Sequence, residues 1–173
     1  MIYLSHRPFA HTTVDMQIHC HARRDFAKSP EQVFALAIDS ARFAPTFTGF
    51  GPIPAILAIH PDGPMRLGAV RSVHNSDGSL LSECTDALDP PHRHDYRLSG
   101  FRPPFSWLIA SAQASWRISP LATGARVHWR YTFGLRSVLA WPVAKPLISV
   151  CMAAAMRRCL ANMARLLDAE APV

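Results

Sequence analysis

Arg71 and Glu83 are an arginine and a glutamate whose spacing could bring their side chains together in a polar site. They lie at nearly equal distances from the turn-forming segment 75–78, so an antiparallel hairpin would place them opposite or diagonal to each other. Both have apolar residues nearby on the same side of the strand, which indicates inward-facing side chains, and a buried charge needs a partner. The pair is either a polar anchor for a ligand carbonyl or carboxylate, or an exposed or structural ion pair between strands.

Two tyrosines are the next candidates. Tyr96 and Tyr131 occur on the apolar faces of predicted strands, where a phenol can donate a hydrogen bond to a ligand oxygen, act as an acid or simply fill the core. The sequence has no serine in a G-x-S-x-G motif and no cysteine with a nearby histidine partner. A catalyst built from these residues would therefore polarise carbonyls and move protons rather than form a covalent intermediate.

The histidines do not indicate a metal centre. His19 and His21 share one side of a strand, as two metal ligands would, but that side is the polar one. His92 and His94 have the same spacing, but His92 lies in a proline-rich turn and no third ligand is indicated. We therefore expect no metal site and no cofactor.

The cysteines and the apolar segments bear on the cellular setting. The four cysteines form no C-x-x-C pair, and residues 1–11 lack the pattern of a secretory signal, so we expect a cytoplasmic protein with reduced thiols. Segment 138–156 is nearly as long as a bilayer span, but Pro142, Lys145 and Pro146 make it a poor one. The segment is better explained as part of a helix buried against a sheet.

The candidate residues fall on a simple series of elements. Alternation over 13–22 predicts a half-buried strand, and Ser-Pro-Glu-Gln at 29–32 is a capping box that begins the first of two short helices. An apolar stripe between Ile148 and Leu167 predicts a long C-terminal helix from about residue 146 to residue 169. The remaining strands are expected at 55–60, 65–74, 80–88, 94–100, 107–119 and 126–134. This order predicts an α+β fold, in which a curved antiparallel sheet of six or seven strands wraps around the long helix.

Composition limits the domain count and the partners. A chain of 173 residues with 49% hydrophobic residues is expected to form one domain, with its core at about 12–169. The net charge of +6 favours anionic partners. Because the basic residues are scattered singly or in pairs and match no nucleic-acid-binding motif, we expect no nucleic-acid partner.

The chain resembles the helix-grip superfamily (SRPBCC), which includes START domains, Bet v 1-type allergens and bacterial polyketide cyclase/dehydrase-like proteins. The residues that carry the resemblance are 29–34, 68–71, Glu83, 90–91, Tyr96, Trp116, Trp129 and the amphipathic segment 157–167. Members of this superfamily hold a hydrophobic ligand between the sheet and the long helix. They also carry out very different functions, so the resemblance is more specific for the fold than for an activity.

Inward-facing alanines suggest that such a cavity exists here. Ala110, Ala112 and Ala114 share a face of one predicted strand and leave room beside the aromatic residues of the next strand. The candidate ligand-binding residues are Arg71, Glu83, Tyr96, Ala112, Trp116, Trp129, Tyr131, Met152 and Met156. The alternative is a solid core in which Trp129, Phe133 and the helix methionines fill the space.

Three kinds of function remain open from the sequence. The first is binding or transport of a hydrophobic small molecule such as a lipid, an isoprenoid or an aromatic polyketide. The second is a polyketide cyclase, aromatase or dehydratase that uses general acid–base catalysis in the same cavity. The third is a regulator that acts on a protein partner without a ligand, which a filled core would favour.

A gate to the cavity is predicted from apolar residues in two loops. Phe50 and Ile53 in the loop 49–54, and Phe101 and Phe105 in the loop 101–105, stand where loops are normally polar. The apolar residues 138–141 extend this patch, and with the basic excess they suggest transient contact with a membrane. Ordinary loop packing or a homodimer interface are the alternatives.

Overall fold

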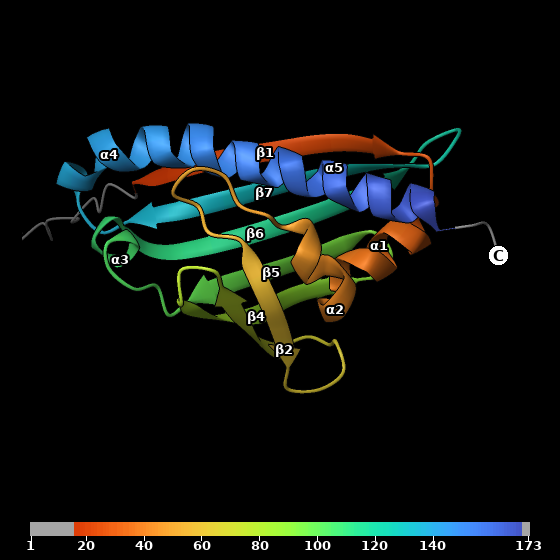
Figure 1. Ribbon diagram of the computed structural model, residues 1–173, viewed down its shortest axis with the longest axis horizontal. Helices are drawn as coiled ribbons and strands as arrows, with labels where there is room; N and C mark the ends of the chain where they lie inside the picture. Colours follow the sequence, from red (N-terminus) through yellow and green to blue (C-terminus); the bar gives the residue numbers. More distant parts are fainter. Residues whose placement is uncertain (1–15, 171–173) are drawn as a thin grey trace, which may run out of the picture.

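The computed structural model describes residues 16–170, and its centre is a single antiparallel sheet of seven strands. The strands are β1 (Gln17–Phe26), β2 (Ile56–Pro61), β3 (Val70–Asn75), β4 (Leu80–Asp89), β5 (Arg93–Ser99), β6 (Ile109–Pro120) and β7 (Ala125–Leu135). Their spatial order is β1-β7-β6-β5-β4-β3-β2, so each of β2 to β6 pairs with the next strand in the chain. β1 forms one edge of the sheet by pairing with β7, which places the first and last strands side by side (Figure 1).

Helices cover one face of this sheet. The short helices α1 (Pro30–Ile38) and α2 (Ser40–Phe43) and a 3-10 turn, Ala44–Thr46, follow β1, and the one-turn helix α3 (Phe105–Leu108) precedes β6. The C-terminal helix runs from Val138 to Ala169 and lies across the sheet beside β1 (Figure 1). It consists of a 3-10 turn (Val138–Ala140), α4 (Trp141–Pro146), a π-helical segment (Leu147–Met152) and α5 (Ala153–Ala169). The seven-stranded sheet, the two short helices and the long helix confirm the predicted helix-grip architecture.

The start of α1 follows from its local sequence. The Ser29 hydroxyl accepts a hydrogen bond from the Gln32 backbone N–H at 3.4 Å, and the Gln32 side chain accepts one from the Ser29 N–H at 3.1 Å. Pro30 occupies the first turn, where its missing N–H removes no hydrogen bond. This is the capping box that the sequence predicts.

Several strand boundaries differ from those expected from the sequence. The first strand extends to Phe26, and residues 13–15 of the predicted strand lie outside the described part of the chain. The third strand begins at Val70 rather than at residue 65, because a turn with Gly68 at φ 76° precedes it. The loop 101–108 contains α3, which was not predicted, because a single helical turn has too few residues for a periodic pattern.

A bulge in β6 exposes one of the three alanines that were predicted to face inward. The register between β6 and β7 shifts between Ile109 and Ser111, so Ile109 is buried while Ala110 is exposed. An extra residue in one strand reverses the facing of its neighbours, and alternation alone does not reveal it. Ala112 and Ala114 are buried as predicted.

The helix continues through Pro146 instead of beginning there. A proline inside a helix removes one backbone hydrogen bond, and the chain widens into the π-helical segment directly after this residue. From Ile148 onward the apolar stripe packs against the sheet, with Met156, Leu160 and Met163 completely buried. The core therefore lies between the sheet and α5, while the amino-terminal end of the helix extends beyond it.

Candidate functional site

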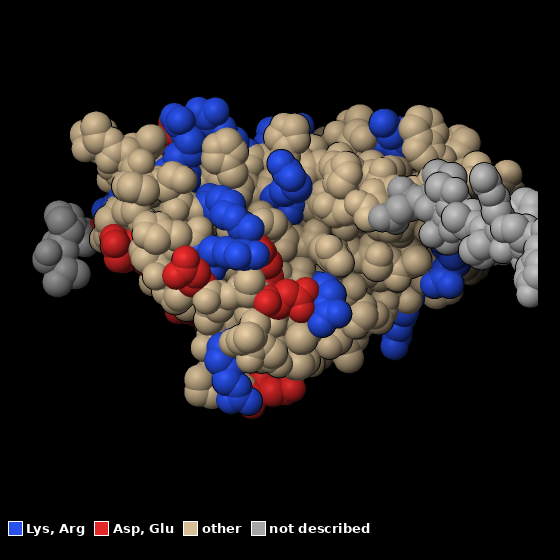
Figure 2. All heavy atoms as spheres, turned by 180° about the vertical axis from the view of Figure 1, so that it is seen from behind, with Lys and Arg blue, Asp and Glu red and all other residues tan. Residues whose placement is uncertain are grey.

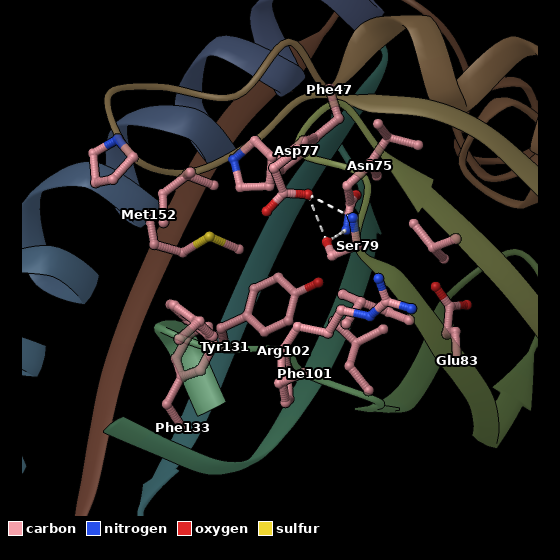
Figure 3. A pocket seen from close by; sticks show the side chains of 18 of the residues that line it. Phe47, Asn75, Asp77, Ser79, Glu83, Phe101, Arg102, Tyr131, Phe133 and Met152 are labelled. Atoms are coloured by element: carbon pink, nitrogen blue, oxygen red, sulfur yellow. Dashed lines mark hydrogen bonds between the residues drawn. The ribbon is translucent and has the colours of Figure 1, made fainter. Parts of the chain in front are cut away.

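A cavity of about 290 Å³ lies between the sheet, the C-terminal helix and two loops. Most of its wall is apolar, with only a few polar side chains among the aromatic and aliphatic ones (Figure 3). The wall includes residues of β2, β3, β4, β5 and β7, Leu147 and Met152 of the C-terminal helix, and the segments around Ile53 and Phe101. A concave, mostly apolar space with few polar groups is the usual form of a small-molecule site.

Eight of the residues proposed from the sequence line this cavity. They are Glu83, Tyr96, Trp129, Tyr131 and Met152 among the ligand-binding candidates, and Ile53, Phe101 and Phe105 among the gate residues. Phe101 and Phe105 contact each other with ring centroids 5.4 Å apart, and Phe105 also packs edge-on against Phe133 at 6.3 Å. The loop that carries them therefore forms part of the cavity wall.

The other five proposed residues do not line the cavity. Ala112 of β6 is buried but is not part of the cavity lining. Trp116 packs against Trp129 and Phe43, with ring centroids 4.5 and 6.0 Å apart. Met156 of α5 packs against β1, with its sulfur 3.6 Å from the sulfur of Cys20. Phe50 and Arg71 also lie outside the lining, and each has another partner.

Phe50 differs from the other gate residues because its ring is exposed. The Arg158 guanidinium lies over that ring, 5.1 Å from its centroid, on the outer side of the C-terminal helix. Gly49 has φ 68°, which allows the tight turn of this loop, and a β-carbon there would lie 2.3 Å from the Ile53 carbonyl oxygen. The two ends of this loop thus face in different directions, with Ile53 toward the cavity and Phe50 away from it.

Arg71 and Glu83 face each other across β3 and β4 as a buried ion pair. The backbone register pairs them directly, and both Nε and a terminal nitrogen of Arg71 donate to Oε1 of Glu83, at 2.9 and 2.5 Å. Arg71 also donates to the carbonyl oxygen of Ile38 at 3.2 Å. Only Glu83 reaches the main cavity, while Arg71 borders a separate pocket beside α2. Arg71 therefore acts on the cavity by positioning the Glu83 carboxylate.

Two opposing effects act on the pKa of the Glu83 carboxyl group. Burial raises the pKa of this carboxyl, and the charge and hydrogen bonds of Arg71 oppose that rise. A buried carboxylate with one paired cation needs no further cation for its charge. It contributes an acceptor on an otherwise largely apolar wall.

Tyr96 and Tyr131 form a hydrogen-bonded pair inside the cavity. Their hydroxyl oxygens are 2.9 Å apart, and both residues are buried. Burial, followed by the charge of Glu83, raises the pKa of Tyr96, and burial raises the pKa of Tyr131. Both phenols therefore stay protonated near neutral pH and serve as hydrogen-bond donors or acceptors, not as phenolate bases.

Trp129 provides a polar group without a partner. Its side chain lines the cavity and is 1% exposed, and its indole N–H is the only buried side-chain nitrogen or oxygen in residues 16–170 that lacks a hydrogen bond. An unsatisfied buried donor costs about 1–3 kcal/mol, so native proteins rarely keep one without a reason. A ligand oxygen that reached this nitrogen would supply the missing acceptor.

Sequence reasoning missed the polar turn between β3 and β4. Asn75, Asp77 and Ser79 line the cavity and are joined by hydrogen bonds, with the Asn75 amide 2.9 Å from the Ser79 hydroxyl and that hydroxyl 2.7 Å from the Asp77 carboxylate (Figure 3). Arg102 lines the same cavity from the opposite loop. The sequence identified residues 75–78 only as a turn, because the approach of this turn to the loop 101–105 is a tertiary feature.

His94 packs in the core beside one of the cavity tyrosines. The sequence placed it in a metal-like spacing with His92, but its ring is buried beside Tyr96, with centroids 5.0 Å apart. Burial, assisted by the charge of Arg71, lowers the pKa of His94 to about 3. The neutral imidazole therefore belongs to the packing behind the tyrosines and does not line the cavity.

The described residues contain no cluster suited to a metal ion. No three His, Cys, Asp or Glu side chains within 16–170 lie close enough to share one. His19 and His21 are exposed, and Nδ1 of His19 lies 3.0 Å from the Thr132 hydroxyl. The polar groups in the cavity lining are two phenols, an indole, an amide, a hydroxyl, two carboxyl groups and the Arg102 guanidinium.

Comparisons with solved structures agree on the fold. BexL, described as a di-domain ARO/CYC from the BE-7585A biosynthetic pathway, is 14% identical with a TM-score of 0.69, over 92% of this chain and 53% of that one. DynU16, a putative protein of the dynemicin biosynthetic locus, is 18% identical with a TM-score of 0.62, over 87% of this chain and 47% of that one. Ara h 8.0201 is 16% identical with a TM-score of 0.60, over 88% of this chain and 99% of that one. The chain thus spans about half the length of the first two proteins.

Sequence comparison identifies the family. A comparison with curated proteins finds no match. The profile of the family described as "Polyketide cyclase / dehydrase and lipid transport" matches residues 17–168, from the first strand to the end of the long helix. The match includes every residue that lines the cavity. The chain therefore belongs to the polyketide cyclase/dehydrase and lipid transport family.

Proposed function

We propose that this protein binds a hydrophobic small molecule that carries a hydrogen-bond acceptor, such as a carbonyl oxygen, in the cavity between the sheet and the C-terminal helix. The observation that carries the proposal is the unpartnered indole N–H of Trp129 in the cavity wall. A solid core would leave this donor without an acceptor, whereas a ligand oxygen would complete it. The lipids, isoprenoids and aromatic polyketides expected from the sequence include molecules of this kind.

The rest of the cavity supports an apolar body for the ligand. Phe47, Leu98, Phe133 and Met152 present hydrocarbon, aromatic or thioether surface to the space. The tyrosine pair and Glu83 are the polar groups of the neighbouring strands. A molecule that is mostly apolar and has one or two oxygens fits this distribution better than a sugar or a nucleotide, which would leave many polar groups unpaired.

Catalysis on the bound molecule is the second candidate, and the convergence of Glu83, Tyr96 and Tyr131 on one cavity favours it. Two protonated phenols could polarise a ligand carbonyl while a nearby carboxylate accepts a proton, as cyclisation or dehydration of a poly-carbonyl chain requires. The similarity of the fold to BexL, which is described as an ARO/CYC protein, agrees with this chemistry. A cyclase would release a chemically altered ligand and a carrier an unaltered one, which mass spectrometry of the recovered ligand distinguishes.

Binding is tested with a fluorescent naphthalene ketone, whose emission reports both an apolar site and a hydrogen bond to its carbonyl. Trp129→Phe keeps an aromatic ring but removes the N–H, so we expect about five- to tenfold weaker binding. The matched control is Trp141→Phe, which removes an indole N–H from an exposed tryptophan outside the cavity lining and should leave the affinity unchanged.

The outcome that contradicts the proposal is equally clear. If the folded wild-type protein does not bind the ketone, or if both tryptophan variants lose affinity to the same extent, the Trp129 N–H does not hold a ligand. Circular dichroism of both variants establishes that the fold is retained.

A further inference from the structure

An exposed apolar face lies at one end of the molecule. Trp107 of α3, together with Val138, Leu139, Trp141 and Val143 at the start of the C-terminal helix, is exposed by 44% to 87%. α3 and α4 contact each other, and both lie at the same end of the sheet (Figure 1). We call these five residues the apolar end face. Large apolar side chains exposed together on a folded protein mark an interaction surface.

The helix that carries this face is unusually apolar for one that is mostly uncovered. Val138–Ala169 is long and apolar enough to cross a membrane by length and composition, yet only 33% of its most apolar window is buried. The later part of the helix packs on β1 through residues such as Met156, so the helix is held within the fold. The exposed apolar surface therefore belongs to its amino-terminal part.

The segments that carry the apolar end face contain basic residues but no acidic ones. Ten of the 18 lysines and arginines, but none of the 12 acidic residues, lie between Asp95 and Asp168, a stretch that includes α3, β7 and α4. Lys145 lies 4.9 Å over the Trp141 ring, and Arg136, which donates to the Ser106 carbonyl at 2.8 Å, links β7 to α3. Figure 2 shows the molecule from behind, and the right-hand part of this view, toward α3 and α4, contains Lys and Arg but no Asp or Glu.

We propose that the apolar end face docks onto the surface of an anionic lipid bilayer. Exposed tryptophans beside aliphatic residues suit the boundary between headgroups and acyl chains, and Lys145 and Arg136 would contact lipid phosphates. A second copy of the chain is a poorer occupant, because pairing this face with itself would bring the same cations together without an acidic partner.

Docking in this orientation would place the cavity next to the lipid. Phe105 and Leu108 of α3 line the cavity, while Trp107 between them is exposed. Leu147 lines the cavity from the helix, four residues after Val143 of the face. A hydrophobic molecule could therefore pass between bilayer and cavity without crossing much water. The docking itself does not depend on the proposed ligand and is tested without one.

The test is flotation of the full-length protein with vesicles of phosphatidylcholine, with and without about one-fifth phosphatidylglycerol. We expect binding to the anionic vesicles and little to the neutral ones, with a shift of tryptophan emission to shorter wavelengths, because Trp107 and Trp141 are the exposed tryptophans. Leu139→Ser combined with Val143→Ser should lower the partition coefficient about tenfold or more. Raising the salt concentration from about 0.1 M to about 1 M should also weaken binding, because the Debye length falls to about 3 Å.

The matched control is Leu57→Ser combined with Leu67→Ser, which removes two leucines that are 67% exposed on and near β2, away from the face. This variant should bind vesicles like the wild type. The proposal is overturned if the wild type does not bind anionic vesicles, if it binds neutral vesicles equally well, or if both double variants lose binding equally. It is also overturned if the wild type is a dimer in solution that Leu139→Ser and Val143→Ser dissociate, because a second copy then covers the face.

Discussion

At the scale of single residues, Arg71 and Glu83 combine a structural and a chemical role. The pair lies in the sheet with side chains only 4% and 6% exposed, so each charge depends on the other for stabilisation. Because Glu83 borders the main cavity and Arg71 does not, the pair presents an acceptor to the cavity while its cation stays behind the wall.

Removal of Arg71 alone should be costly. Arg71→Met leaves a buried carboxyl without its partner, and we expect urea unfolding to show a loss of about 3–5 kcal/mol at neutral pH. The double variant with Glu83→Leu should recover most of this loss, since no unpaired charge remains. Equal losses in the single and double variants would show that the pairing does not matter.

The same variant has a defined pH dependence. Burial already raises the pKa of Glu83, and without Arg71 the folded state holds this proton more strongly still than the unfolded state, whose reference value is 4.5. Stability of Arg71→Met should therefore fall as pH rises above about 4.5, so its deficit relative to wild type is smaller at pH 5 than at pH 8.

His94 should account for part of the fall in the free energy of unfolding at acidic pH. Its pKa is lowered to about 3 in the folded state from a reference value of 6.5, so the unfolded state binds the proton first as pH falls. Between these values the wild type should lose about 1.4 kcal/mol of unfolding free energy per pH unit from this group. In His94→Gln this contribution is absent, and the stability difference from wild type should narrow from pH 6.5 to pH 4. A constant difference across that range would contradict the assignment.

At the scale of elements, the hairpin between β6 and β7 is held by a close backbone approach. Gly124 has φ 91°, and a β-carbon there would lie 1.9 Å from the Phe26 carbonyl oxygen at the end of β1. This contact joins the turn of the last hairpin to the first strand, so it helps to set the register between β1 and β7.

Substitution at Gly124 should therefore weaken the whole sheet. Gly124→Ala combines an unfavourable φ with a backbone overlap, and we expect a loss of about 3 kcal/mol or more in thermal or urea unfolding. Gly78→Ala is the matched control, because Gly78 has φ 77° but nothing within 4 Å of the added carbon. It should cost only about 1 kcal/mol. Similar losses in both variants would mean that the overlap is relieved by a small movement.

At the scale of the whole molecule, cavity and solid core coexist on one sheet. Toward the carboxyl end of the C-terminal helix, α5 packs closely on β1, and Met156, Leu160 and Met163 leave no exposed surface. Toward the amino end, the loops 49–54 and 101–105 approach the sheet and enclose the 290 Å³ space. The two alternatives considered for the sequence, a cavity and a filled core, thus apply to different parts of the molecule.

Local sequence patterns predict most of the elements and the pairing of β3 with β4. The capping box at Ser29, the alternation in the strands and the apolar stripe of the long helix are patterns of neighbouring residues, and local geometry alone imposes them. Arg71 and Glu83 could be paired from sequence because a short hairpin fixes the register between adjacent strands. The family resemblance rests on the same elements, and the profile match over residues 17–168 shows it.

Which inward-facing residues reach the cavity depends on contacts between distant parts of the chain. Trp116 and Trp129 are both buried on the same side of the sheet, but Phe43 covers the first while the second borders the space. Ala110 is exposed because of a bulge, and Asp77 joins the cavity from a turn. These outcomes depend on distances between segments far apart in the chain, and the periodicity of a single strand or helix contains no information about such distances.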